Sequence, residues 1–414
     1  MRLWTGPAFW ITLSLAMAAA IIVVLISPVV ATIYKAPNLV GLLAILALSM
    51  PLGALASVPG MIVRARMQFG VFAVYGLLEI VAQALLTVGL AWNGFGAYSF
   101  VIPMPILAAV RAVVWWRLAA TKIGFRPQWT RWKYVVGNTA VTAASRTIIN
   151  VIGQGDYLVL GLLATQDVVG AYYFAFRLAG QPLWTLAGNF SGVLFPALVQ
   201  VKSDPVRQGA AAVKASVLLS FCVMPLAFIQ AAVAAPLVAS FFGQKWAASI
   251  SIIQLLSVGL ALDAVSWVAG CLLNARGEFR AGLRYLLMQA PFFFILVVAG
   301  ALLDQAVGVA YGVCIYYAVT QPFFVWGVYR RVGVSAREVA RIYLQPTFYA
   351  ASAVGFGWLA SMLPFVAAFP LARVAVICAL GIPLYGVMVC WLAPEVWREL
   401  SSRVVSALKR QTPE

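Results

Sequence analysis

The sequence predicts an all-α polytopic membrane protein with about 12 transmembrane helices in two lobes. The composition, the succession of long apolar runs and an internal repeat all indicate this class. Of the 414 residues, 64% are apolar and only 9% are charged, whereas ordinary soluble domains carry about 25% charged residues. Because one spanning helix needs about 20 apolar residues, a chain of this length has room for a dozen spans with short connections.

The spans follow from apolar runs that end at charged residues or at turns rich in Gly, Pro and Asn. They are expected at 7–31, 38–63, 69–91, 96–117, 134–164, 167–199, 211–242, 247–273, 279–302, 306–329, 339–363 and 369–393. We expect them to group into an N-lobe of four helices (1–133), a C-lobe of six (134–331), two peripheral helices (332–393) and a tail (394–414). The tail places Trp397, Leu400, Val404 and Leu408 on one helical face. That pattern is typical of a helix lying on the membrane surface; a solvated tail is the alternative.

The basic residues indicate the direction of the spans. Three of the 28 Lys and Arg residues lie inside spans: Arg111, Arg146 and Arg177. Three more fall in the loops on one side: Lys35, Lys245 and Arg373. The other 22 fall on the opposite side, which the positive-inside rule identifies as the cytoplasm. Both termini are therefore expected there, and the net charge of +17 reflects membrane topology rather than a nucleic-acid partner.

An internal repeat relates spans one to four to spans seven to ten. Residues 52–91 and 262–301 match at a constant offset of 210, with twelve identical residues in forty, and "ARMQF" (65–69) corresponds to "ARGEF" (275–279). The offset covers six helices, an even number, so both copies have the same orientation in the membrane, as in a parallel repeat about the membrane normal. Spans five and six have no counterpart in the first copy, so we expect the N-lobe to lack its opening helical hairpin.

Several function classes are excluded by what the chain does not contain. It has no histidine, and its five cysteines lie inside spans without ligand spacing, which excludes a His-ligated metal and a Ser-His-Asp triad. The connections are shorter than about 20 residues and contain no P-loop, so ATP-driven transport by this chain alone is also excluded. We expect neither an enzyme nor a bound cofactor, and leave coupling to H+ or Na+ open.

Three blocks of the chain resemble Wzx-type polysaccharide flippases of the multidrug/oligosaccharidyl-lipid/polysaccharide superfamily. The blocks are "GDYLVLGLLATQDVVGAYYFAFRLAGQPL" (155–183), "LFPALVQVKSD" (194–204) and "GQKWAASISIIQLLSVG" (243–259). The resemblance extends over essentially the whole chain, apart from the missing first hairpin. It implies two lobes around a central, generally cationic cavity.

The same resemblance implies an activity, a location and partners. Such proteins move undecaprenyl-pyrophosphate-linked oligosaccharide from the cytoplasmic to the periplasmic leaflet of the bacterial inner membrane, by alternating access. The implied partners are this polyprenyl-pyrophosphate-linked glycan, membrane lipids, a polysaccharide polymerase and a chain-length regulator. The glycan itself, from an O-antigen, exopolysaccharide or capsule pathway, is not readable from the residues.

Charged residues inside the spans are the candidate functional residues, because an ionisable side chain at bilayer depth costs about 2.5–3.5 kcal/mol or more. Arg146 begins a polar stripe that continues with Asn150 and Gln154 on the same helical face. A guanidinium stays charged and binds phosphate bidentately, so Arg146 is a candidate for a pyrophosphate. The alternative is an ion pair with Glu79 or Asp263.

The remaining intramembrane charges have structural and functional interpretations. Asp156 and Arg177 lie at matching depths on the two arms of one hairpin, which predicts an ion pair; contact with substrate or coupling to protons is the alternative. Glu79 and Asp263 lie near the middle of spans three and eight, where each could line the cavity, carry a proton or Na+, or pair with an arginine. Arg111, close to the cytoplasmic end of its span, is expected to extend to the interface.

Three other functions compete with the flippase. A multidrug or small-cation exporter of the same superfamily is expected to favour acidic residues in its cavity, whereas Arg146 is basic. A membrane glycosyltransferase needs a sizeable periplasmic loop with polar catalytic residues, and the outward loops are short and nearly uncharged. A truncated, inactive remnant is the third alternative, because of the missing hairpin.

Overall fold

The computed structural model describes residues 2–66, 69–120 and 129–409, and every regular element in these ranges is a helix. The first helices are α1 (Arg2–Ile33), α2 (Leu39–Ala65), α3 (Phe69–Trp92), α4 (Tyr98–Val101), α5 (Pro103–Ala119), α6 (Trp129–Leu163) and α7 (Gln166–Gln200). They are followed by α8 (Pro205–Phe241), α9 (Ser249–Arg276), α10 (Phe279–Tyr329), α11 (Ala336–Ala360), α12 (Pro364–Ala367), α13 (Pro370–Leu392) and α14 (Pro394–Lys409).

The helices confirm the predicted all-α polytopic membrane fold. Each of the twelve predicted ranges coincides with helix to within a few residues. Within the described residues, nine helices are long and apolar enough to cross a membrane. The difference has two sources: α10 contains two predicted spans, and α6 and α11 carry more polar residues than the others.

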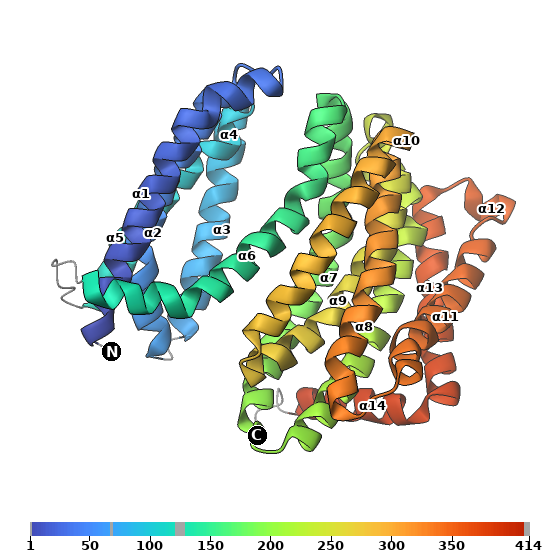
Figure 1. Ribbon diagram of the computed structural model, residues 1–414. Helices are drawn as coiled ribbons and strands as arrows, with labels where there is room; N and C mark the ends of the chain where they lie inside the picture. The colour runs from blue at the N-terminus through green and yellow to red at the C-terminus, as the bar shows by residue number, and fades with distance from the viewer. Residues whose placement is uncertain (1, 67–68, 121–128, 410–414) are drawn as a thin grey trace. The chain divides into compact units, whose positions relative to one another are not determined.

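The chain divides into two compact units, Met1–Ala140 and Val141–Glu414. In the first unit α2 packs against α1 and α5, and α3 packs against α4 and α5 (Figure 1). The indole of Trp115 stacks on Phe72 at 4.3 Å between ring centroids, and Trp116 Nε1 donates to the Leu55 carbonyl. Aromatic side chains thus join α5 to both α2 and α3.

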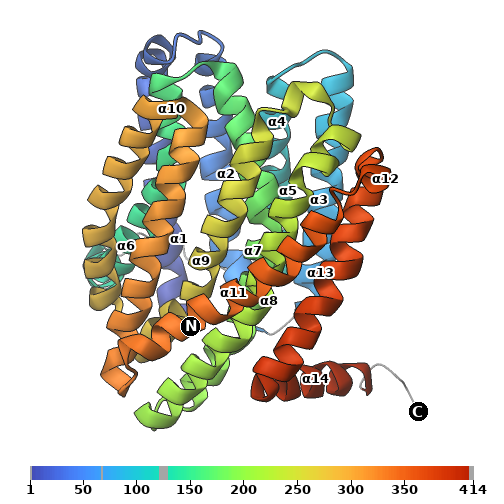
Figure 2. The same cartoon turned by 90° about the vertical axis from the view of Figure 1, so that its right-hand side faces the viewer.

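The second unit is built around α9, which packs against α7, α8 and α10. Leu256, Leu260, Val265 and Val268 of α9 are fully buried. Beside this group, α11 and α13 pack against each other and against α8 (Figure 2). The packing of α8 on α9 and of α9 on α10 corresponds to that of α1 on α2 and of α2 on α5, the neighbour relations expected for the predicted repeat.

The chain reverses direction within α10, at Asp304 and Gln305, whose backbone angles are not helical. The two halves then pack so closely that a Cβ added at Gly300 or Gly308 would collide with the backbone of the other. Glycine is required at such a contact because it allows two backbones to approach closely. This turn separates the predicted spans 279–302 and 306–329.

The tail forms the helix α14, and part of its apolar face covers protein. Val396 and Leu400 pack against the cluster around Phe221 and Tyr349, and Glu399 accepts from Lys214 at 2.9 Å. Trp397 is 41% exposed. The side chains of the predicted face beyond residue 402, including Val404 and Leu408, lie outside the described part.

Candidate functional site

The polar stripe of α6 is present and exposed. Arg146, Asn150 and Gln154 follow one another at intervals of one turn, and all three side chains are exposed. Within the described residues of the second unit, the Arg146 guanidinium forms no ion pair or hydrogen bond. Of the two carboxylates predicted as alternative partners, Asp263 accepts from Trp267 within the second unit, and Glu79 belongs to the first unit.

Asp156 lies on a different, buried face of the same helix. Its side chain is buried among Ile152, Val159 and Leu160. Oδ2 accepts from the Tyr172 hydroxyl of α7 at 2.7 Å, and Oδ1 accepts from the backbone N–H of Tyr157 at 2.9 Å. These two hydrogen bonds partly replace the water that the carboxylate loses on burial.

The predicted Asp156–Arg177 ion pair is wrong. Arg177 is exposed; its Nε donates to the Tyr173 hydroxyl at 3.1 Å, and its guanidinium lies 5.4 Å from the centroid of the same ring. Tyr173 and Arg177 are one turn apart on the outer face of α7, whereas Tyr172 points inward to Asp156. The two charges match in depth along the hairpin, but they point in different directions around their helix axes.

Glu79 belongs to the first unit. It pairs with Arg111 inside the first unit, and this ion pair connects α3 to α5. Arg111 therefore has a carboxylate partner instead of extending alone to the membrane interface. Of the interpretations of Glu79, the structure shows the partner of an arginine, and that arginine is Arg111.

Asp263 of α9 lies partly buried in the second unit. Its Oδ2 accepts from Trp267 Nε1, one turn further along, at 3.1 Å. Tyr317 of α10, which is almost fully buried, lies close enough to both Asp263 and Asp156 to interact electrostatically with each. The described part of the second unit thus contains two carboxylates and a tyrosine between α6, α9 and α10, and neither carboxylate has a cationic partner there.

Tyr172 and Tyr317 are functional candidates that the sequence did not predict. Tyrosines are frequent throughout this chain, and the pairs at 172–173 and 316–317 look alike in sequence. Only the structure shows that Tyr172, and not Tyr173, binds a carboxylate, and that both Tyr316 and Tyr317 lie near Asp263, with Tyr317 also near Asp156. The set of candidates therefore separates into an exposed stripe on α6, a buried acidic group with Tyr172 and Tyr317, and the Glu79–Arg111 pair in the first unit.

The fold also occurs in a solved structure. The inward closed conformation of the lipid II flippase MurJ matches 95% of this chain and 85% of its own with a TM-score of 0.77, at 12% sequence identity. This similarity shows a common fold. The two sequences are too divergent for the roles of residues in one chain to be assigned to positions in the other.

Several curated proteins are similar in sequence. The succinoglycan biosynthesis transport protein ExoT of Rhizobium meliloti is 26% identical over 333 residues, which are 78% of this chain and 65% of that protein. The teichuronic acid biosynthesis protein TuaB of Bacillus subtilis is 22% identical over 72% of this chain and 63% of its own length. The chain thus spans slightly less than two thirds of the length of these relatives.

A family model with the description "Polysaccharide biosynthesis protein" matches residues 5–251, more than half of the chain. The match includes the first unit from residue 5 onward and the helices that carry Arg146, Asp156 and Arg177. It agrees with the family indicated by the three sequence blocks. The chain belongs to the polysaccharide biosynthesis protein family.

Proposed function

We propose that the protein is a flippase that moves undecaprenyl-pyrophosphate-linked oligosaccharide from the cytoplasmic to the periplasmic leaflet of the bacterial inner membrane. It works by alternating access, with both termini in the cytoplasm, and passes the glycan to a polysaccharide polymerase and a chain-length regulator. The family match, the relatives in succinoglycan and teichuronic acid synthesis and the fold shared with a lipid II flippase support this proposal.

The observation that carries the proposal is the exposed Arg146 at the start of the polar stripe on α6. A cation at bilayer depth with no carboxylate partner among the described residues of its own unit is costly, and a pyrophosphate offsets this cost. The planar guanidinium offers paired N–H donors to phosphate oxygens. Asn150 and Gln154 add amide donors and acceptors on the same face, which suit sugar hydroxyls.

A proteoliposome assay tests the proposal with a fluorescent undecaprenyl-pyrophosphate oligosaccharide. We expect Arg146→Ala to abolish most of the translocation, and Arg146→Lys to retain part of it because an ammonium keeps the charge but loses the bidentate geometry. Arg177→Ala is the matched control: it removes the same charge from the neighbouring helix, where Tyr173 already engages the guanidinium. Wild-type flipping by folded Arg146→Ala would contradict the proposal.

Coupling to H+ or Na+ is a second part of the proposal, and it rests on Asp156 and Asp263. Both carboxylates lack a cationic partner within the described residues and share Tyr317 as a neighbour. A carboxylate in this setting can take up a proton or hold a small cation as the transporter cycles. We expect Asp263→Asn to make translocation independent of an imposed H+ or Na+ gradient. If the gradient dependence were unchanged, Asp263 would not take part in ion coupling.

A further inference from the structure

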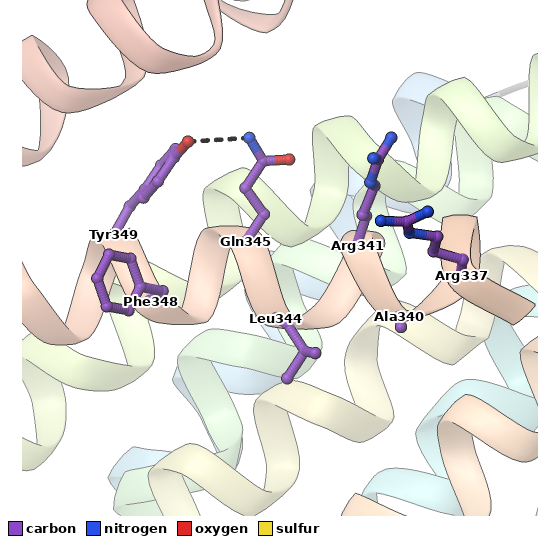
Figure 3. Close-up of a pocket in the computed structure, with 7 residues that line it drawn as sticks. All are labelled: Arg337, Ala340, Arg341, Leu344, Gln345, Phe348 and Tyr349. Atoms are coloured by element: carbon purple, nitrogen blue, oxygen red, sulfur yellow. Dashed lines mark hydrogen bonds between the residues drawn. The ribbon is translucent and has the colours of Figure 1, made fainter.

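A groove on α11, lined by residues that no part of the proposed translocation uses, has the chemistry of a lipid-headgroup site. The cavity measures about 640 Å³ (Figure 3). Its lining residues all belong to α11: Arg337, Ala340, Arg341, Leu344, Gln345, Phe348 and Tyr349. The groove is therefore an open feature on the surface of a single helix.

The cationic end of the groove is formed by Arg337 and Arg341. They are one turn apart, about 6 Å along the axis, and both are exposed. Glu338 accepts from Ser335 as part of the helix cap and attracts Arg341 without forming an ion pair, and Glu278 pairs with Arg331. No described carboxylate forms an ion pair with either guanidinium, so two positive charges face outward within one helical turn.

The other end of the groove is polar on one side and apolar on the other. Gln345 donates from Nε2 to the Tyr349 hydroxyl at 2.9 Å, and in Figure 3 both side chains point to the same side of the helix as Arg341. The hydroxyl oxygen thus accepts one hydrogen bond and keeps its own proton to donate. Leu344 is 67% exposed and Phe348 64% exposed, so they form an apolar surface open to the bilayer.

We propose that this groove binds an anionic phospholipid, with the phosphate on Arg337 and Arg341 and the start of an acyl chain on Leu344 and Phe348. Guanidinium groups match phosphate oxygens bidentately, and basic residues at a helix end attract anionic headgroups. The adjacent apolar side chains favour a lipid over a soluble phosphate. The order of the residues along α11, charges first and apolar side chains one to two turns later, matches the order of headgroup and acyl chain in a leaflet.

The inference can be tested by native mass spectrometry of the delipidated protein, titrated with phosphatidylglycerol. We expect one bound copy in the wild type, and binding weaker by roughly tenfold or more in the double variant Arg337→Gln/Arg341→Gln. Arg280→Gln/Arg284→Gln is the matched control. These two arginines are also exposed and one turn apart, at the start of α10, but lie outside the groove, so affinity within twofold of the wild type is expected.

Three further outcomes decide between the groove and its alternatives. Equal loss in both double variants would show diffuse attraction by basic residues and overturn the site. Equal binding of phosphatidylcholine would show that the groove does not select a negative headgroup. Displacement of the lipid by millimolar glycerophosphate, or by equimolar undecaprenyl phosphate, would assign the groove to a soluble phosphate or to the carrier lipid. None of these outcomes depends on whether the protein flips oligosaccharide, so the two proposals fail separately.

Discussion

The neighbouring tyrosines of α7 have different hydrogen-bond partners, and this difference gives a prediction for single residues. Tyr172 is fully buried and donates to Asp156, whereas Tyr173 is 49% exposed and accepts from Arg177. Tyr172→Phe leaves a buried carboxylate with one hydrogen bond fewer, which costs about 1–3 kcal/mol. We expect a clear loss of thermal stability in detergent for Tyr172→Phe and a much smaller loss for Tyr173→Phe. Equal losses would mean that Asp156 does not depend on the Tyr172 hydroxyl.

The Glu79–Arg111 pair gives a second prediction at the residue scale. Removing either partner leaves one charge among apolar helices, whereas removing both leaves none. We therefore expect Glu79→Gln and Arg111→Gln each to lower the unfolding midpoint, and the double variant to be less destabilised than the sum of the two. A double-mutant cycle on unfolding measures this coupling. Strict additivity would show that the pair contributes no specific interaction between α3 and α5.

The hairpin within α10 gives a prediction at the scale of elements. The effect of replacing a glycine there depends on whether that glycine lies at the contact between the two halves. A Cβ at Gly308 or Gly312 would collide with backbone of the opposing half, at Gly300 and Leu296 respectively, whereas a Cβ at Gly282 would meet open space. We expect Gly308→Ala and Gly312→Ala to reduce the folded yield strongly. Gly282→Ala should be neutral or stabilising by up to about 1 kcal/mol, since alanine favours helix. Size-exclusion chromatography and thermal unfolding compare the three variants; tolerance of Gly308→Ala would argue against the close approach.

The helices themselves could be predicted from the sequence, but their facing directions could not. Apolar runs and turns define where each span begins and ends, and depth follows from counting residues along a helix. The side of α7 that faces α6 depends on packing of the whole second unit, and this is why Asp156 and Arg177 matched in depth but not in direction. For the same reason, Arg111 could not be recognised from sequence as the partner of Glu79.

At the scale of the whole molecule, the exposed part of the candidate site could be predicted because it is periodic. Arg146, Asn150 and Gln154 recur at one-turn intervals on a single helix, so the sequence alone places them on one face. The buried part brings together α6, α7, α9 and α10 over long separations in the chain, from Asp156 to Tyr317. No local pattern encodes such a contact, and the tyrosines in it resemble those that only fill space.

The direction of the whole molecule in the membrane gives the last prediction. The loop between α7 and α8 contains Lys202, whereas Lys245 lies between α8 and α9, at the other end of α8. Because cytoplasmic loops collect Lys and Arg, we expect a cysteine at Lys202 to be labelled by an impermeant maleimide only after the cells are opened. A cysteine at Lys245 should be labelled in intact cells with a permeable outer envelope. The five native cysteines lie within helices, and replacing them by serine or alanine provides the background. If Lys202→Cys were labelled from outside and Lys245→Cys were protected, the topology would be the opposite of the predicted one. The Arg337–Arg341 groove would then lie in the outer leaflet.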